Sequence, residues 1–130
     1  MSPLPAASSD SDLIAFIDQW VVLLEQESYG EAFQFTDHDP GTSWTPDLIR
    51  AVIKSHGEAS PAQRVTLEGK PTDITQRKEV TRWAQNRLKR IGEVWYDLNI
   101  NGFASDLTAT FWIVPTERGI VLRLDDIHVM

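Results

Sequence analysis

Cysteine is absent from this chain of 130 residues. Its absence excludes a disulfide framework, a cysteine nucleophile and any metal site built from thiolates, and it suits a reducing compartment such as the cytoplasm. Long apolar runs are also missing, since no stretch approaches the roughly 20 apolar residues that a membrane-spanning helix requires. The beginning of the chain contains neither the basic nor the apolar region of a secretory signal. We therefore expect a soluble cytoplasmic protein with no membrane partner.

Basic residues are the minority among the charged side chains, because 12 Lys and Arg stand against 19 Asp and Glu. The formal net charge of −7 repels phosphate backbones, so we expect no nucleic acid partner. Motifs with a specific spacing are missing as well, since the sequence contains no phosphate-binding loop, no nucleophile elbow and no His-Glu-x-x-His zinc motif. We accordingly predict no metal site and no cofactor.

The first half of the chain shows helical patterns. After residues 1–11, which we expect to form a disordered leader, apolar residues recur at steps of three and four. The helix is predicted to start at Asp12, with Ser11 or Asp12 as its N-cap. Its apolar stripe consists of Leu13, Phe16, Ile17, Trp20, Val21 and Leu24.

Two shorter helices are predicted to follow. Ser28 and Glu31 have the spacing of a capping box, which predicts a helix that begins near Tyr29 and ends near Phe35. A Thr-Pro pair at residues 45–46 supplies an N-cap and a first helical residue for a third helix. This helix is expected to close at a glycine, residue 57.

The middle of the chain is harder to interpret. Residues 58–78 are predicted to be a long connection with one short strand in the stretch RVTLE, residues 64–68. In residues 75–91 the apolar positions fit a helix that ends at Gly92, whereas EVTRWA, residues 79–84, also fits a strand. Local periodicity favours the helix, and both interpretations stay open.

The second half of the chain is predicted to be β. Three strands are indicated at residues 93–100, 103–114 and 120–129. The first two are joined by Asn101-Gly102, the strongest short-range signal for a type I′ hairpin. The sequence therefore predicts an α+β fold, in which N-terminal helices pack on an antiparallel sheet.

The closing strand contains Asp126 and His128 where core residues are expected. If the hairpin register continues without interruption, both side chains point to the helix-covered face, next to Tyr96 and over the small residue Ala109. These four residues would then line a pocket. A carboxylate held there would need a hydrogen-bonding partner or would keep its proton.

A β-bulge at Asp125-Asp126 is the alternative for the same strand. It would turn Ile127 and Val129 into the core and His128 to solvent. The alternation of apolar and polar residues leaves both registers open.

The opposite face of the predicted sheet carries two tryptophans and would not be covered by the three helices. A patch of this kind predicts self-association or a protein partner, with coverage by residues 58–78 as the alternative. We expect Arg123 to lie across Trp112, and Asp97 to stand opposite Asp106. The predicted interface consists of Trp95, Thr108, Thr110, Trp112 and Arg123.

A family resemblance rests on two stretches, VWYDLNINGFASDLTATF at residues 94–111 and LRLDDIHVM at residues 122–130. They resemble a family of small bacterial proteins in the NTF2-like, or cystatin-like, superfamily. The resemblance implies a single domain over residues 12–130, built as a curved sheet wrapped by helices. It also implies a homodimer formed through the sheet, and a strand rather than a helix at residues 79–84.

Two functions are compatible with this sequence. The first is a non-catalytic module that binds a small ligand or another protein, such as an immunity or accessory protein. The second is an isomerase or dehydratase, since NTF2-like enzymes use Asp, His and Tyr side chains inside the cone. Asp126 would then be the general base, His128 the acid or orienting partner, and Tyr96 a hydrogen-bond donor. The sequence favours the module and leaves catalysis open.

Overall fold

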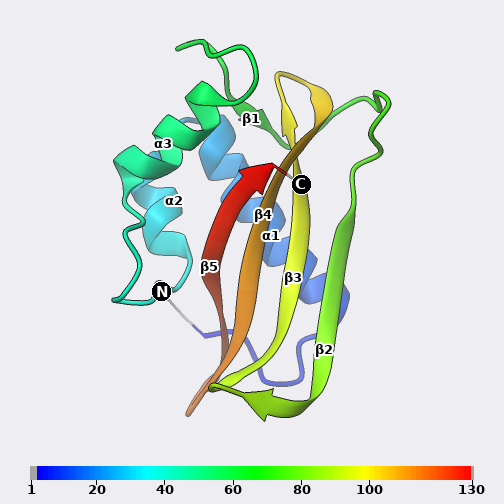
Figure 1. Cartoon of the computed structure of the whole chain (residues 1–130). Coiled ribbons are helices and arrows are strands. Elements are labelled where there is room, and N and C mark those ends of the chain that lie inside the picture. The colour runs from blue at the N-terminus through cyan, green and yellow to red at the C-terminus, as the bar shows by residue number, and fades with distance from the viewer. Residues whose placement is uncertain (1–2, 130) are drawn as a thin grey trace.

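The computed structural model describes residues 3–129, so residues 1–2 of the predicted leader and Met130 of the closing strand lie outside the described residues. Within that range, three helices pack on a curved, open antiparallel sheet of five strands, which confirms the predicted α+β class (Figure 1). The elements are α1 (Asp10–Glu25), α2 (Tyr29–Phe35), α3 (Pro46–Ser55), β1 (Val65–Thr66), β2 (Lys78–Arg87), β3 (Arg90–Ile100), β4 (Phe103–Thr116) and β5 (Gly119–Val129).

The sheet order is β1-β3-β4-β5, and β2 also pairs with β3. Helix α1 lies behind the sheet, while α2 and α3 lie beside β5 (Figure 1). The sheet therefore has an inner face, which is covered by helices, and an outer face, which is not. Within the described part of the chain, no helix is long and apolar enough to cross a membrane.

Helix α1 starts two residues earlier than the sequence predicts. Its N-cap is Ser9, whose hydroxyl accepts a hydrogen bond from the Asp12 backbone N–H at 3.1 Å, while the Asp12 carboxylate accepts one from the Ser9 N–H at 2.9 Å. This capping box replaces Ser11 or Asp12 as the predicted cap. The leader prediction is corrected as well, since Leu4 exchanges two backbone hydrogen bonds with Ile120, at 2.7 and 2.8 Å.

The two shorter helices occur where the sequence predicts them. The Ser28 side chain makes no capping hydrogen bond to α2, so the predicted capping box is not formed there. In α3 the Thr45 hydroxyl accepts a hydrogen bond from the Leu48 N–H at 3.1 Å, as expected of an N-cap. Gly57 follows the C-cap with a φ of 59°, the left-handed conformation that closes many helices.

The helical interpretation of residues 75–91 is wrong, because this stretch forms the edge strand β2 and the turn into β3. Gly92, the expected end of the helix, lies inside β3. A Cβ atom at this position would lie 2.4 Å from the Thr81 carbonyl oxygen, so glycine lets the two strands approach. The turn uses Leu88 and Lys89, with φ values of 53° and 63°.

The core lies between α1 and the inner face of the sheet, and Trp20 of the predicted apolar stripe is at its centre. This indole is fully buried and meets the Phe111 ring edge-on, with 5.1 Å between ring centroids. Leu24 is fully buried beside it in the same cluster, whereas Phe16 is half-buried and stacks on Phe35. Aromatic contacts of this kind hold the helix on the sheet.

Candidate interaction face

The closing strand contains the β-bulge. Phe111 pairs with Leu124, but the preceding residue of β4, Thr110, pairs with Asp126. Asp125 is therefore an extra residue in β5. Ile127 consequently faces the core, where it is 4 % exposed. Val129, which the bulged alternative would also bury, is 55 % exposed and lies at the end of the strand.

Side-chain contacts from distant elements hold this bulge. The Trp44 indole N–H, from the segment before α3, donates to the Asp125 carbonyl oxygen at 3.0 Å. The Thr110 hydroxyl donates to the Asp125 carboxylate at 3.1 Å. The Asp126 carboxylate accepts a hydrogen bond from the Ile127 N–H at 2.9 Å. Together these bonds satisfy groups that the extra residue removes from the ladder.

The predicted pocket is not formed, because the bulge moves two of its residues to the other face. Tyr96 and its partner Ala109 are buried on the inner face, while Asp126 and His128 pair with Thr110 and Thr108 on the outer face. The Nδ1 atom of His128 instead lies 3.2 Å from the Asp126 carboxylate. The three side chains proposed for catalysis therefore do not converge on one point.

The Tyr96 hydroxyl is part of a hydrogen-bonded cluster that joins α1 to the sheet. Its hydroxyl donates to the Asp18 carboxylate of α1 at 2.5 Å, and the Lys78 ammonium of β2 binds the same oxygen at 3.0 Å. Burial, followed by the hydrogen bond to Asp18, raises the pKa of Tyr96 far above its ordinary value. The hydroxyl therefore keeps its proton and links the helix to two strands.

A second irregularity lies in the β3-β4 pair. Ile100 pairs with Phe103 across the Asn101-Gly102 turn, as predicted. Farther from the turn, between Asn99 and Asp97, the register shifts by two residues. Tyr96 therefore faces Ala109, whereas an uninterrupted hairpin register would place it opposite Leu107, and Val94 faces Phe111.

This shift also separates the two aspartates that were expected to face each other. Asp97 pairs with Thr108 and accepts a hydrogen bond from its hydroxyl at 2.8 Å. The Asp106 carboxylate lies 3.2 Å from Nε2 of His56. Neither carboxylate therefore faces the other, and the predicted like-charge pair is wrong.

The outer face carries three tryptophans. Trp95 and Trp112 lie there, as predicted, and both are half-buried. Trp83 of β2 joins them, since its ring centroid lies 5.8 Å from that of Trp112. The predicted interface residues Thr108 and Thr110 are on this face but buried beneath their neighbours. We call this surface the Trp face: Trp83, Trp95, Trp112 and the arginines stacked on them.

Each tryptophan of the Trp face has an arginine over its ring. The guanidinium carbon of Arg90 lies 4.2 Å from the Trp112 centroid. The corresponding distances are 5.0 Å from Arg77 to Trp95 and 5.8 Å from Arg87 to Trp83. Arginines on indole rings are a typical cation–π arrangement. The connection at residues 58–78 was the alternative cover for this face. One of its residues, Arg77, lies over Trp95.

Arg123 does not lie across Trp112, contrary to the prediction. Its guanidinium instead binds the Asp37 carboxylate at 2.6 Å, in the segment after α2. This ion pair ties that segment to the edge of β5, where Asp37 also exchanges backbone hydrogen bonds with Leu122 and Leu124. Arg123 is therefore occupied within the chain, and Arg90 takes the predicted place over the indole.

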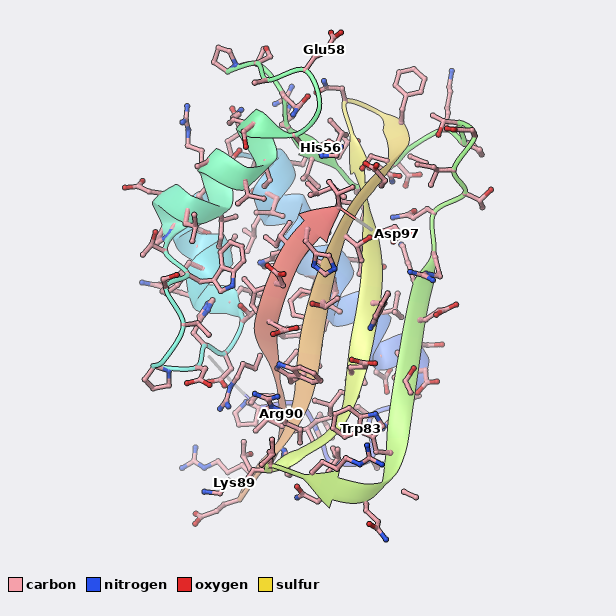
Figure 2. All side chains as sticks on the ribbon, viewed as in Figure 1. His56, Glu58, Trp83, Lys89, Arg90 and Asp97 are labelled. Atoms are coloured by element: carbon pink, nitrogen blue, oxygen red, sulfur yellow. The ribbon has the colours of Figure 1, made fainter. Side chains whose placement is uncertain are left out.

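Charge is distributed unevenly along the outer face. Basic side chains gather at the turn between β2 and β3, and acidic ones toward the opposite end of the strands; Figure 2 shows Lys89 and Arg90 at one end and Asp97 toward the other. The basic half consists of Arg87, Lys89 and Arg90. The acidic residues shown on this face are Asp125 and Asp126, together with Asp97, which is only 8 % exposed.

Sequence reasoning does not find Trp83, Arg87 or Arg90 as part of this face. The helical interpretation of residues 75–91 gives these side chains a different spacing, and the strand interpretation of residues 79–84 ends before the turn. The alternation of Glu79, Thr81 and Trp83 was the available signal, because alternate residues of a strand share one face.

The chain matches no protein-family model, no curated protein and no solved structure. The NTF2-like resemblance therefore stays a prediction about residues 93–130. Within residues 3–129, no group of three or more His, Cys, Asp or Glu side chains is placed to hold a metal ion.

Proposed function

We propose that this protein is a non-catalytic, protein-binding module of the NTF2-like type, and that it forms a homodimer through the Trp face. The observation that carries this proposal is the set of three half-buried tryptophans, each with an arginine over its ring, on the sheet face that no helix covers. Tryptophan and arginine are the residues most enriched among those that dominate binding energy at protein interfaces.

The inner face supports a binding module rather than an enzyme. Trp20, Tyr96 and Phe111 fill the space between α1 and the sheet and are fully buried. A surface groove of about 340 Å³ lies between α1 and β2 and is lined by residues that include Asp18 and Lys78. An enzyme of the isomerase type would need an enclosed site with convergent acid and base groups.

The test is the double variant Trp95→Glu, Trp112→Glu. Two carboxylates placed in the centre of the Trp face would have to be desolvated on association, so the dimer should dissociate. Light scattering coupled to size-exclusion chromatography measures the mass of both proteins. The wild type should be a dimer at micromolar concentrations and the variant a monomer.

Val22→Glu is the matched control, because Val22 is an exposed apolar residue on α1, away from the sheet. It introduces one carboxylate, where the double variant introduces two, and should leave the dimer intact. A wild type that is monomeric even at high concentration would rule out the homodimer. A double variant that stays dimeric would rule out the Trp face as its interface.

A further inference from the structure

The chain covers one of the two sheet edges and leaves the other open. The edges are formed by β5 on one side and by β2, with the short β1, on the other (Figure 1). Along β5, the backbone groups of Leu4 and Asp37 form hydrogen bonds of 2.7 to 3.0 Å with the strand, and the Trp44 indole bonds to its bulge. Along β2, residues 3–129 supply no backbone hydrogen bond on the side away from β3. An edge strand with free N–H and C=O groups can pair with a strand of another chain.

The free backbone groups of β2 belong to alternate residues. The Asp97 N–H donates to the Arg77 carbonyl oxygen at 2.9 Å, so these two residues form a pair of the hydrogen-bonded type. The pairing then continues in register as far as Arg82. Because the two types of pair alternate, the N–H and C=O groups of Lys78, Val80 and Arg82 point away from β3. Each of these residues therefore offers one donor and one acceptor to an incoming strand.

The charged side chains of β2 do not cover these groups. Charged residues on an edge strand often protect it from pairing with other chains. Here the Lys78 ammonium binds the Asp18 carboxylate of α1 at 3.0 Å. The Arg82 guanidinium binds the Asp10 carboxylate, also of α1, at 2.9 Å. Both side chains therefore turn toward the helix and leave the edge of the strand open.

The groove of about 340 Å³ between α1 and β2 follows this edge, with the two ion pairs at its ends. Helix α1 rises about 12 Å from Asp10 to Asp18. Strand β2 extends about 13 Å from Lys78 to Arg82, so the helix and the strand flank the groove over the same length. Between the ion pairs the groove is lined by small or apolar residues, which are Ser11, Ile14, Ala15 and Val80.

A strand added to β2 would place alternate side chains in this groove. Residues that stand directly opposite each other in neighbouring strands point to the same face of the sheet. The side chain opposite Val80 would therefore lie beside Ile14 and Ala15 of α1, where an apolar group fits. In complexes formed by strand addition, the backbone hydrogen bonds supply affinity and such pockets supply the sequence preference.

Charge adds a second preference. Residues 77–90, which form β2, the turn and the start of β3, contain six Lys or Arg and one Glu, in a chain of net charge −7. Two of the six basic groups are paired with carboxylates of α1, and a third lies 4.0 Å from the glutamate. Arg87 and Lys89, beside the turn, are exposed and form no ion pair within residues 3–129. Complementary charge therefore favours a partner with acidic residues at this end of β2.

We propose that this edge and groove bind an extended segment of a partner protein, which adds to β2 as one more strand. The segment carries an apolar side chain opposite Val80 and acidic residues on the side of the β2-β3 turn. The proposal rests on the proposed protein-binding function, for which it names the chemistry of the partner. It does not depend on the homodimer, because it uses the edge of the sheet and not the Trp face.

The test begins with a random peptide library, displayed on phage and selected on the wild-type protein. The enriched peptides should share an apolar residue with acidic residues to one side of it. A fluorescein-labelled copy of the strongest peptide then serves as the probe, and fluorescence anisotropy measures its dissociation constant for each variant. A library that yields no binding peptide, or only peptides without this pattern, would overturn the proposal.

Val80→Pro tests the backbone contact. Proline removes the outward N–H of this residue but no hydrogen bond between β2 and β3, and proline is tolerated on edge strands in such positions. Binding should weaken at least about tenfold, because a carbonyl oxygen of the peptide is left without its donor. The control Val80→Ala keeps the N–H and should bind at least about fivefold more tightly than Val80→Pro. Equal affinities for these two variants would show that the peptide does not pair with β2.

Ala15→Phe tests the groove and leaves β2 unchanged. Ala15 is exposed on α1, so the new ring can occupy the groove without entering the core. Binding should weaken at least about tenfold, because the ring takes the place of the apolar side chain of the peptide. The control Gln19→Phe adds the same ring one helical turn further on, outside the lining of this groove, and should bind like the wild type. Wild-type affinity in Ala15→Phe would overturn the proposal, and circular dichroism checks that each variant is folded.

Lys89→Glu tests the charge preference. Lys89 is exposed in the turn and does not belong to the Trp face. The substitution should weaken binding about threefold, and wild-type binding should weaken as sodium chloride is raised from about 0.05 to 0.5 M, because salt screens exposed charges. Unchanged or tighter binding by Lys89→Glu would remove the acidic residues from the proposed segment.

Light scattering of Val80→Pro separates a partner peptide from a second copy of this chain. If β2 pairs with β2 of another copy, the proline should lower the mass of the wild-type assembly, and this result would overturn the proposal. An unchanged mass with lost peptide binding supports it. The homodimer and the peptide site also fail separately. A monomeric wild type that binds the peptide removes only the dimer, whereas a dimer that binds no peptide removes only this inference.

Discussion

The bulge in β5 can be tested by replacing the residue that it turns into the core. Ile127 is 4 % exposed and pairs with Ala109 on the inner face, whereas Val129, two residues later, is 55 % exposed. Ile127→Ala should therefore be strongly destabilising and Val129→Ala nearly neutral. In a continuous register both side chains would lie on the outer face, and the two substitutions would have similar, small effects.

The magnitude follows from the buried volume. Ile127→Ala removes three carbon atoms from a nearly closed site, which costs about 0.8 kcal/mol per group for transfer alone. The cavity that remains adds to this, and isoleucine-to-alanine changes in protein cores cost about 2–5 kcal/mol in total. Because β5 is an edge strand that can partly relax, we expect about 3 kcal/mol. Val129→Ala should cost less than about 0.5 kcal/mol.

Urea unfolding, followed by circular dichroism, measures both free energies. All proteins should be compared at one concentration, because the stability of a self-associating protein depends on it. His128→Ala is the third member of the series and should have a small effect, since its side chain lies on the outer face. Equal costs for Ile127→Ala and Val129→Ala, or a large cost for His128→Ala alone, would refute the bulged register.

Two further predictions concern the inner face. Trp20→Ala should cost about 3–5 kcal/mol of unfolding free energy, with Val22→Ala on the exposed side of α1 as its control; a cost below about 1 kcal/mol would contradict the packing of Trp20 on Phe111. Tyr96→Phe should cost about 1–3 kcal/mol at pH 7, because it removes the hydrogen bond to Asp18. The folded protein holds the Tyr96 proton to a higher pH than the unfolded chain does, so this side chain makes wild-type stability fall as the pH rises above about 10. In urea unfolding between pH 7 and 11, the free energy of unfolding of the Tyr96→Phe variant should fall less than that of the wild type. Parallel pH profiles for the two proteins would show that folding does not raise the pKa of Tyr96.

Local signals predicted those parts of the fold that depend on neighbouring residues. Thr45 caps α3 through a bond to a residue three positions away, and Asn101-Gly102 adopts positive φ values of 52° and 84° for the tight turn. Such conformations follow from the side chains involved, whatever surrounds them. The hairpin, the three helices and the α+β class were therefore predictable.

Strand β2 was not predictable from local periodicity. Its apolar residues also recur at a helical spacing, and its turn is made by Leu88 and Lys89, which are unusual at positive φ. The strand exists because Lys78 to Arg82 pair with β3, and because Lys78 reaches Asp18 on α1. The resemblance implied a strand at residues 79–84, which includes Trp83. The structure extends this strand to Arg87, whose guanidinium lies over the Trp83 ring.

The sequence by itself determined that β5 alternates apolar and polar residues and that two aspartates interrupt the pattern. Only the tertiary structure decided to which face those aspartates turn. The reason is physical: a one-residue bulge is stabilised by partners far away in the chain, here the Trp44 indole, 81 positions before Asp125. The same bulge moved Asp126 and His128 away from Tyr96 and onto the outer face, which carries the proposed interface.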